Sequence, residues 1–259
     1  MNIVVCIKQV PDTTEVKIDP KTNTLIREGV ASIINPFDLY AIEEGVRLKE
    51  KFGGKVTVIS MGPKQVENAL REAISLGADE AVLMSDRAFA GSDTLATSLA
   101  LSEGIKKTGF DVIICGKQAI DGDTAQVGPG IAAHLDIPQI TYVKKIESIS
   151  GGKILAERMV EEGYEVVESA LPVLITVVKE INEPRLPSLK GKMKAKKAEI
   201  RTITSEDLGI DKSKVGLDGS PTWVMKIFTP PRKEGGKIFE GSADEVVAKL
   251  ISELQDNLI

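Results

Sequence analysis

The chain has 259 residues, of which 42% are hydrophobic and 27% charged, so it has the composition of a globular protein with a sizeable core. Its formal net charge of −5 argues against a general nucleic-acid binder. With two distant cysteines and one histidine, the chain offers neither a disulfide framework nor the ligands of a zinc or iron–sulfur site.

Strand-like and helix-like segments alternate in the first half of the chain. Four short apolar runs have the length of buried strands, at 2–7, 55–62, 79–85 and 111–116. Three segments between them predict helices, at 36–54, 64–78 and 92–109. Gly53 and Gly77 mark two helix ends, and Ser92 or Asp93 is the expected N-cap of the third helix. This alternation predicts an α/β fold with a doubly wound, mostly parallel sheet.

The pattern changes after about residue 143. Residues 150–178 carry a Gly-Gly turn and alternating side chains, which predict an antiparallel hairpin and then one more buried strand. From about Glu180 the chain is irregular and locally basic, and it ends in an amphipathic helix at 242–258. We therefore expect an α/β domain at 1–180 and, at 181–259, an arm that packs on another protein.

The start of the chain shows no targeting signal. Met1 runs directly into IVVCI without a basic segment, and no apolar run approaches the ~20 residues that span a bilayer. We expect a cytoplasmic protein without membrane insertion.

The stretch GKQAIDGDTAQVGPG, residues 116–130, places small and polar residues where a strand passes into a helix. Gly116 and Gly122 permit close backbone approach, while Asp123 and Thr124 can cap a helix whose free N–H groups face an anion. This indicates either an anion site or an ordinary capped helix start.

Other strand ends are expected at the same edge of the sheet, where open α/β sheets bind ligands. NPFD at 35–38, MGP at 61–63 and SDTLAT at 92–97 add hydroxyl and backbone donors of the kind that a nucleotide requires. In addition, VVCIKQV and IICGKQA both contain Cys-X-Lys-Gln. This repetition is either coincidence in a lysine-rich chain or a sign that both strand ends line one crevice.

The chain offers no recognisable catalytic machinery. His134 stands alone on a helix without a nucleophile motif, and Asp121 and Asp123 lack further carboxylates at metal-binding spacing. We predict no catalytic residue and no metal, and instead a protein that holds a cofactor which supplies the chemistry. Whether the chain is itself an enzyme stays open.

Several motifs, in order over essentially the whole length, resemble the β subunit of electron-transfer flavoproteins. They are VVCIKQVPD, INPFD, VISMGP, LGADEAVL, GKQAIDGDTAQVGP and NEPRLPSLKGKMKAKK. The resemblance implies an adenine nucleotide α-hydrolase-like fold, an α subunit that carries FAD, and a nucleotide in this chain, which is AMP in the mitochondrial-type members. The implied nucleotide-binding residues are Cys6, Asn35, Phe37, Asp38, Met61, Gly62, Gly116, Gln118, Ala119, Ile120, Asp121, Gly122, Asp123, Thr124, Ala125, Gln126 and Val127.

The resemblance also assigns a role to residues 182–197. Their basic run is either a solvated face or a docking arm, and the family implies a recognition loop in which Leu189 inserts into a dehydrogenase partner. Leu186, Lys190 and Lys192 are expected beside it, as an apolar anchor with a charged rim.

Two segments depart from the mitochondrial type, AIDGDTAQVGP and DRAFAGSDTLATS. Both are similar to electron-bifurcating members, in which a second FAD replaces AMP, accepts hydride from NADH, and sends electrons to ferredoxin or flavodoxin and, through the α-subunit flavin, to a dehydrogenase such as acyl-CoA or lactate dehydrogenase. Ser92, Thr94 and Thr97 would then bond the pyrophosphate or the flavin edge, unless they only cap their helix. The alternatives are a non-bifurcating β subunit with structural AMP, and an ATP-binding or signalling protein of the same superfamily.

Overall fold

The computed structural model describes residues 1–12, 31–225 and 235–255. The chain divides into a large unit, Met1–Met225, and a small unit, Lys226–Ile259, and each is described by itself. No helix in the described ranges is long and apolar enough to cross a membrane.

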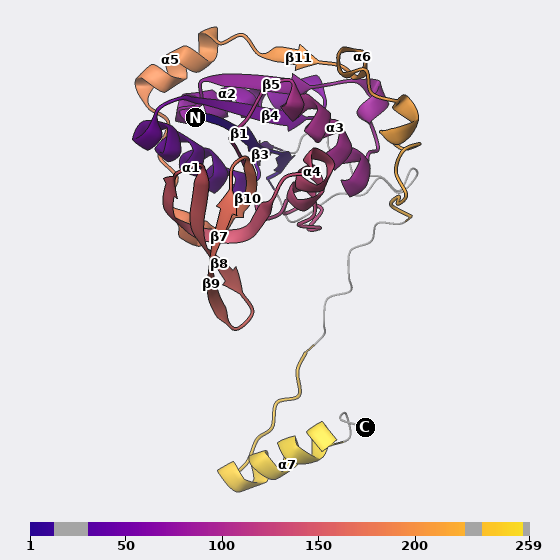
Figure 1. The fold of residues 1–259 in the computed structure, drawn as a ribbon. Coiled ribbons are helices and arrows are strands. Elements are labelled where there is room, and N and C mark those ends of the chain that lie inside the picture. The colour runs from indigo at the N-terminus through magenta and orange to yellow at the C-terminus, as the bar shows by residue number, and fades with distance from the viewer. Residues whose placement is uncertain (13–30, 226–234, 256–259) are drawn as a thin grey trace. The chain divides into compact units, whose positions relative to one another are not determined.

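A nine-stranded sheet in the order β11-β5-β4-β1-β6-β10-β7-β8-β9 forms the centre of the large unit (Figure 1). Its strands are β1 (Asn2–Cys6), β4 (Lys55–Met61), β5 (Glu80–Met84), β6 (Val112–Gly116), β7 (Gln139–Ser150), β8 (Lys153–Val160), β9 (Gly163–Ala170), β10 (Val173–Val177) and β11 (Arg201–Ile203). Neighbours from β11 to β7 are parallel, whereas β7, β8 and β9 pair antiparallel. A separate antiparallel pair joins β2 (Gln9–Pro11) to β3 (Ser32–Ile34). The predicted doubly wound α/β fold with an antiparallel addition is confirmed.

Helices cover both faces of the parallel part. They are α1 (Pro36–Phe52), α2 (Glu67–Leu76), α3 (Thr94–Lys106), α4 (Val127–Leu135), α5 (Leu189–Lys197) and the short α6 (Ser205–Leu208), with 3₁₀ turns η1 (Lys64–Val66), η2 (Arg87–Phe89), η3 (Lys179–Ile181) and η4 (Lys212–Lys214). In the small unit, α7 (Ala243–Gln255) is the expected terminal helix.

The apolar runs became buried strands because both faces of the sheet are covered. Successive side chains of a strand point to opposite faces. In β1, Ile3 and Val5 pack with α1 and α2, whereas Val4 and Cys6 pack with α3 and α4. A strand buried on both sides therefore needs a continuous apolar run, which is how the sequence reads.

The predicted helix ends are confirmed. Gly53 follows α1 at φ 70° and Gly77 follows α2 at φ 126°, both in the left-handed range that glycine tolerates. Asp93 is the N-cap of α3, and its carboxylate accepts a hydrogen bond from the Ala96 N–H at 3.1 Å.

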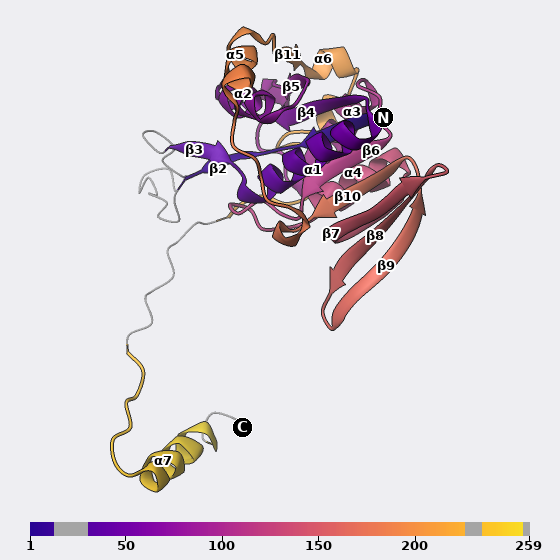
Figure 2. The ribbon, with the colours of Figure 1, turned by 90° about the vertical axis from the view of Figure 1, so that its left-hand side faces the viewer.

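The second half differs from the expectation in two respects. The Gly151-Gly152 turn does join two antiparallel strands, β7 and β8, but β9 adds a third strand before the buried β10 (Figure 2). Residues 181–225 belong to the large unit, because β11 pairs with β5 and α5 packs against α2. Packing of residues 181–259 on a partner subunit stays a prediction.

Candidate functional site

The chain reverses its direction of travel across the sheet between β1 and β6. Strands β4 and β5 lie on one side of β1, and β6 lies on the other. The carboxyl ends of these parallel strands meet at one edge, and such a reversal opens a ligand crevice there. Cys6, Met61 and Gly116 end three of these strands, and the other expected nucleotide-binding residues follow in the loops or at the starts of α1, α3 and α4.

The two Cys-X-Lys-Gln segments lie side by side at this reversal. Cys6 and Cys115 are register partners on β1 and β6, as the interpretation of one shared crevice requires. Both side chains are buried. The adjacent Cys6 sulfur and burial both raise the pKa of the Cys115 thiol, so this thiol stays protonated.

Asn35, which precedes α1, holds the turn at 116–127 against the crevice. Its buried carboxamide donates to the Gln118 carbonyl at 2.8 Å and accepts from the Ile120 N–H at 3.1 Å. An amide side chain satisfies a backbone donor and a backbone acceptor together, as these two bonds require. The start of α1 therefore fixes the position of Gln118 and Ile120.

Asp38, in the first turn of α1, joins the two central strand ends. Its Oδ2 accepts the Lys8 N–H at 2.7 Å, and the carboxylate also accepts hydrogen bonds from Asn35 and the Gly116 N–H. Burial nevertheless outweighs these bonds and raises the pKa of Asp38 to about 7. Asp38 therefore exchanges its proton near neutral pH, where an exposed aspartate would be fully ionised.

The turn at 116–127 is shaped by left-handed residues. Asp123 has φ 56° and Ala125 has φ 55°, and the Asp123 N–H donates to the Ala119 carbonyl at 2.9 Å. Asp123 also accepts a hydrogen bond from the Gln118 side chain.

The prediction that Asp123 and Thr124 cap the next helix is wrong, because α4 begins at Val127 with Gln126 at its N-cap and no side-chain cap. Pro129 occupies the first turn of α4, where proline costs no hydrogen bond.

The start of α3 approaches this turn from the other side. The hydroxyls of Thr94 and Thr124 are 3.3 Å apart. Thr97 Oγ1 donates to the Ser92 carbonyl at 3.4 Å, and the Ser92 hydroxyl donates to the Phe89 carbonyl and accepts from the Gly216 N–H, each at 2.8 Å. Ser92 is therefore already engaged within the chain, whereas Thr94 faces the turn.

The remaining expected residues have less direct links to the turn. Met61 ends β4, which pairs with β1, and Gly62 follows it and donates its N–H to the Met84 carbonyl at 3.0 Å. Phe37 precedes Asp38 in α1, with the Lys117 ammonium 4.9 Å from its ring. These residues share the edge of the sheet with the turn.

A segment at 215–222 that the sequence did not suggest supports the start of α3. Thr222 donates its hydroxyl to Asp93 at 2.7 Å and its N–H at 3.1 Å, and the Asp93 N–H donates to the Ser220 hydroxyl at 2.8 Å. Asp93 and Thr222 are 129 residues apart, so no pattern of neighbouring residues in the sequence could have indicated this contact. Residues 220 and 222 are thereby tied to the N-cap of α3.

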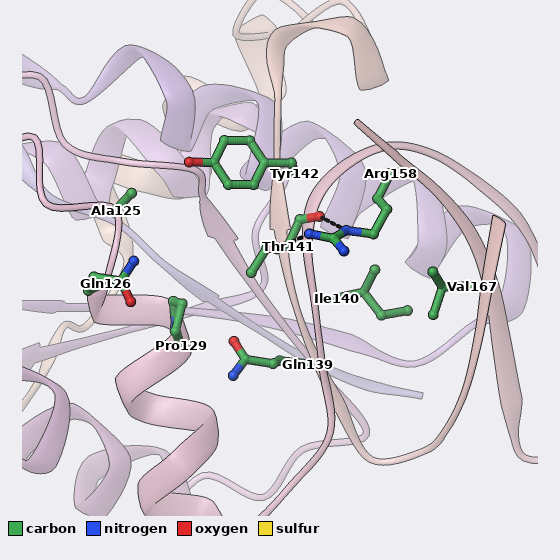
Figure 3. A pocket seen from close by; sticks show the side chains of 9 residues that line it. All are labelled: Ala125, Gln126, Pro129, Gln139, Ile140, Thr141, Tyr142, Arg158 and Val167. Atoms are coloured by element: carbon green, nitrogen blue, oxygen red, sulfur yellow. Dashed lines mark hydrogen bonds between the residues drawn. The ribbon is translucent and has the colours of Figure 1, made fainter. Parts of the chain in front are cut away.

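A cavity of about 330 Å³ adjoins the turn on the β7 side. Its lining residues are Ala125, Gln126, Pro129, Gln139, Ile140, Thr141, Tyr142, Arg158 and Val167. The Arg158 guanidinium reaches back to the Thr141 carbonyl and hydroxyl at 3.0 and 2.9 Å, whereas the Tyr142 hydroxyl points toward the side of Ala125 (Figure 3). Arg158 thus ties β7 to β8, and the cavity borders the crevice at Ala125 and Gln126.

The predicted docking residues are displayed on the surface. Leu186 is 89% exposed and Leu189, the first residue of α5, is 78% exposed, with Lys190 and Lys192 also exposed. Leu189 and Met193 line an open groove together with Lys190, Lys194 and Lys197. An apolar stripe with a cationic rim therefore lies on this helix.

Arg185 anchors this stripe to α1. Its guanidinium donates to Glu43 Oε2 at 2.7 Å and to the two Glu50 oxygens at 2.6 and 3.0 Å. Burial alone would raise the pKa of the Glu43 carboxyl, but hydrogen bonds from Arg185 and Arg47 outweigh it and hold the pKa below its usual value. The forked guanidinium fits such paired carboxylates better than an ammonium does.

Comparison with known proteins gives a consistent picture. The family model "Electron transfer flavoprotein domain" matches residues 22–208. The chain is 59% identical to "Electron transfer flavoprotein subunit beta" of Thermoanaerobacterium thermosaccharolyticum over 98% of both chains. It is 50% identical to "Caffeyl-CoA reductase-Etf complex subunit CarD" of Acetobacterium woodii over 100% of both, and 48% identical to "Protein FixA" of Azotobacter vinelandii over 98% of this chain and 95% of that one.

Proposed function

This chain belongs to the electron transfer flavoprotein family as a β subunit, and on that premise we propose that its nucleotide site holds FAD rather than AMP. The bound FAD would accept hydride from NADH and bifurcate the electrons, one to ferredoxin or flavodoxin and the other, through the FAD of the α subunit, to a dehydrogenase. Family membership removes the signalling-protein alternative.

The approach of the α3 start to the turn is the observation that carries this proposal. Thr94 and Thr124 place hydroxyls 3.3 Å apart, from segments that follow different strands. AMP is one half of FAD, so the turn serves either ligand, and the dinucleotide needs further polar groups beyond the pyrophosphate. Thr94 and Thr97, three residues apart on one helix face, supply them.

The turn and α4 suit the phosphate-bearing half of either nucleotide. No side chain caps α4 at Gln126, so the N–H groups of its first turn are suited to an anion. Gly116 lets the start of α1 lie directly against β6, and Asn35 holds the turn beside it. In this proposal the backbone at 116–127 binds the phosphate, while Cys6, Asp38 and Met61 form the wall behind it.

The runner-up is a β subunit that binds AMP structurally and has no redox centre of its own. It uses the same turn, and FixA-type and CarD-type names both occur among the relatives, so the names do not separate the two. The words "Caffeyl-CoA reductase-Etf complex" do support an enzyme acting on an acyl-CoA as the partner class, with lactate dehydrogenase as the other candidate.

Counting the cofactors of the purified αβ heterodimer tests the proposal directly. We expect about two FAD per heterodimer and bleaching of flavin absorbance by NADH without a mediator. The cofactors would be extracted and quantified by chromatography, so that AMP is measured in the same sample. One FAD together with one AMP would establish the runner-up instead.

Replacing Thr94 and Thr97 with valine should lower FAD retention in the heterodimer. Each hydroxyl bond contributes ~0.5–1.5 kcal/mol, so the double variant should lose about tenfold in FAD affinity. Flavin content after dialysis is the measurement. Thr108→Val is the matched control, because its hydroxyl donates to the Ile105 carbonyl at the other end of the same helix. Unchanged flavin occupancy in the double variant would refute the assigned role.

The predicted docking residues and the C-terminal arm, residues 181–259, complete the proposal. Leu186 and Leu189 insert into the dehydrogenase, with Lys190 and Lys192 facing acidic groups around its pocket. Residues 181–259 contact the α subunit and the dehydrogenase, and the complex acts in the cytoplasm.

A further inference from the structure

Lys8 stands two residues after the end of β1, and hydrogen bonds fix its backbone. Its N–H donates to Asp38 Oδ2 at 2.7 Å, and its carbonyl accepts the Asn35 N–H at 2.8 Å. Both partners belong to the start of α1, which also holds the turn at 116–127. The lysine side chain therefore begins from a rigid point beside that turn.

The ammonium of Lys8 reaches from the end of β1 to the turn after β6. Its Nζ lies 2.6 Å from Asp121 Oδ1, and the two side chains are 48% and 29% exposed. A Cβ placed on Gly122 would lie 3.9 Å from the same nitrogen. The cation thus rests against the turn backbone from the side of β1.

The charge balance of the turn gives this contact its meaning. Residues 116–127 carry two carboxylates, Asp121 and Asp123, close to the α4 N-terminus where a phosphate would bind. Lys117, the cation within the turn, has its ammonium over the rings of Phe37 and Tyr142, at 4.9 and 5.9 Å from their centroids. In the part of the chain that the structure describes, Lys8 alone forms an ion pair with this turn.

We infer that Lys8 is a phosphate-binding residue of the nucleotide site, which Asp121 holds in place until a phosphate oxygen replaces the carboxylate. A half-exposed ion pair contributes little net stability, so replacing the Asp121 carboxylate by a phosphate oxygen costs little free energy. The phosphate gains a positive charge that offsets the repulsion from Asp121 and Asp123. The inference rests on the proposed nucleotide site, but the phosphate chemistry is the same for FAD and AMP.

Two variants with opposite expected effects distinguish phosphate binding by Lys8 from a purely structural role of its ion pair. In the αβ heterodimer, Lys8→Gln should weaken nucleotide binding about tenfold, because it removes a charge-assisted contact to phosphate. Asp121→Asn should strengthen binding, because it frees Lys8 and removes a like charge. Equilibrium dialysis of the stripped heterodimer with FAD and, separately, AMP measures both changes. The loss in Lys8→Gln should shrink at high salt, and Lys8→Arg should restore binding.

The control is Lys55→Gln, whose ammonium pairs with Glu80 at 2.9 Å, similarly exposed, at the opposite end of the parallel strands. It should bind both nucleotides like the wild type. Equal weakening in Lys8→Gln and Asp121→Asn, or no change in Lys8→Gln, would overturn the role of Lys8. A wild-type heterodimer that holds AMP instead of FAD contradicts only the FAD proposal, and one that binds neither nucleotide overturns both.

Discussion

Gly116→Ala should strip the heterodimer of its nucleotide and destabilise the fold by about 1–3 kcal/mol. A Cβ at this position would overlap Asp38 Oδ1 and lie 2.7 Å from the Phe37 carbonyl carbon, which is backbone and has no other rotamer. The start of α1 would have to move away from β6. That shift breaks the bond that Asn35 donates to the Gln118 carbonyl and the bond that it accepts from the Ile120 N–H, and the turn loses its shape.

Two measurements separate the effects of this substitution. Chemical denaturation gives the free energy of unfolding, and cofactor extraction gives the nucleotide content. Gly122→Ala is the matched control in the same turn, since its Cβ would meet only the Lys8 ammonium at 3.9 Å. The control should unfold within about 0.5 kcal/mol of the wild type. If Gly116→Ala matches the wild type in both measurements, the nucleotide site does not depend on the close contact of α1 with β6 at Gly116.

Arg185→Ala should cost about 2–3 kcal/mol of stability and slow electron transfer to the dehydrogenase. Glu43 is only 3% exposed, so removing Arg185 leaves it with Arg47 as its remaining ion-pair partner. The segment that displays Leu186 and Leu189 also loses one of its tethers to α1, while the hydrogen bonds of Asn182 to Tyr40 and Glu44 remain. Thermal and chemical unfolding report the first effect, and reduction of an acyl-CoA dehydrogenase by the heterodimer reports the second.

The pH dependence of this loss follows from Glu43, whose pKa lies below its usual 4.5. A carboxyl whose pKa is lower in the folded than in the unfolded protein stabilises the fold at any pH above its unfolded-state pKa. This stabilisation is lost as the pH falls through the folded-state pKa. The difference between wild type and Arg185→Ala should therefore be full near neutral pH and shrink below about pH 4.5. A difference that grows on acidification would contradict the ion-pair explanation.

Leu189→Ala provides the complementary result. This side chain is 78% exposed, so its truncation should leave stability within about 0.5 kcal/mol of the wild type. It should still slow transfer to the dehydrogenase, while oxidation of NADH with artificial acceptors stays intact. Arg87→Ala, which truncates an exposed side chain in η2, should change neither property. If Leu189→Ala slows both reactions together, the stripe has a structural role instead of a docking role.

The sequence determined the parts of this protein that follow from short-range rules. Continuous apolar runs gave buried strands because helices cover both faces of the sheet, and glycines at 53 and 77 ended helices because they tolerate positive φ. The edge at which Asn35, Gly116 and Thr94 meet was also predictable, since parallel strands place their carboxyl ends together.

Only the tertiary structure decided the contacts between distant segments. Lys8 and Asp121 are 113 residues apart, Asp93 and Thr222 are 129, and Arg185 and Glu43 are 142. The strand β11 is only three residues long and shows no hydrophobic periodicity, so it is recognisable as a strand only through its pairing with β5. Composition and periodicity describe a residue's neighbours along the chain, whereas charge pairing and edge-strand pairing depend on neighbours in space. The strand ends that lie at this edge could therefore be predicted from the sequence, but the ion pair of Lys8 with Asp121 could not.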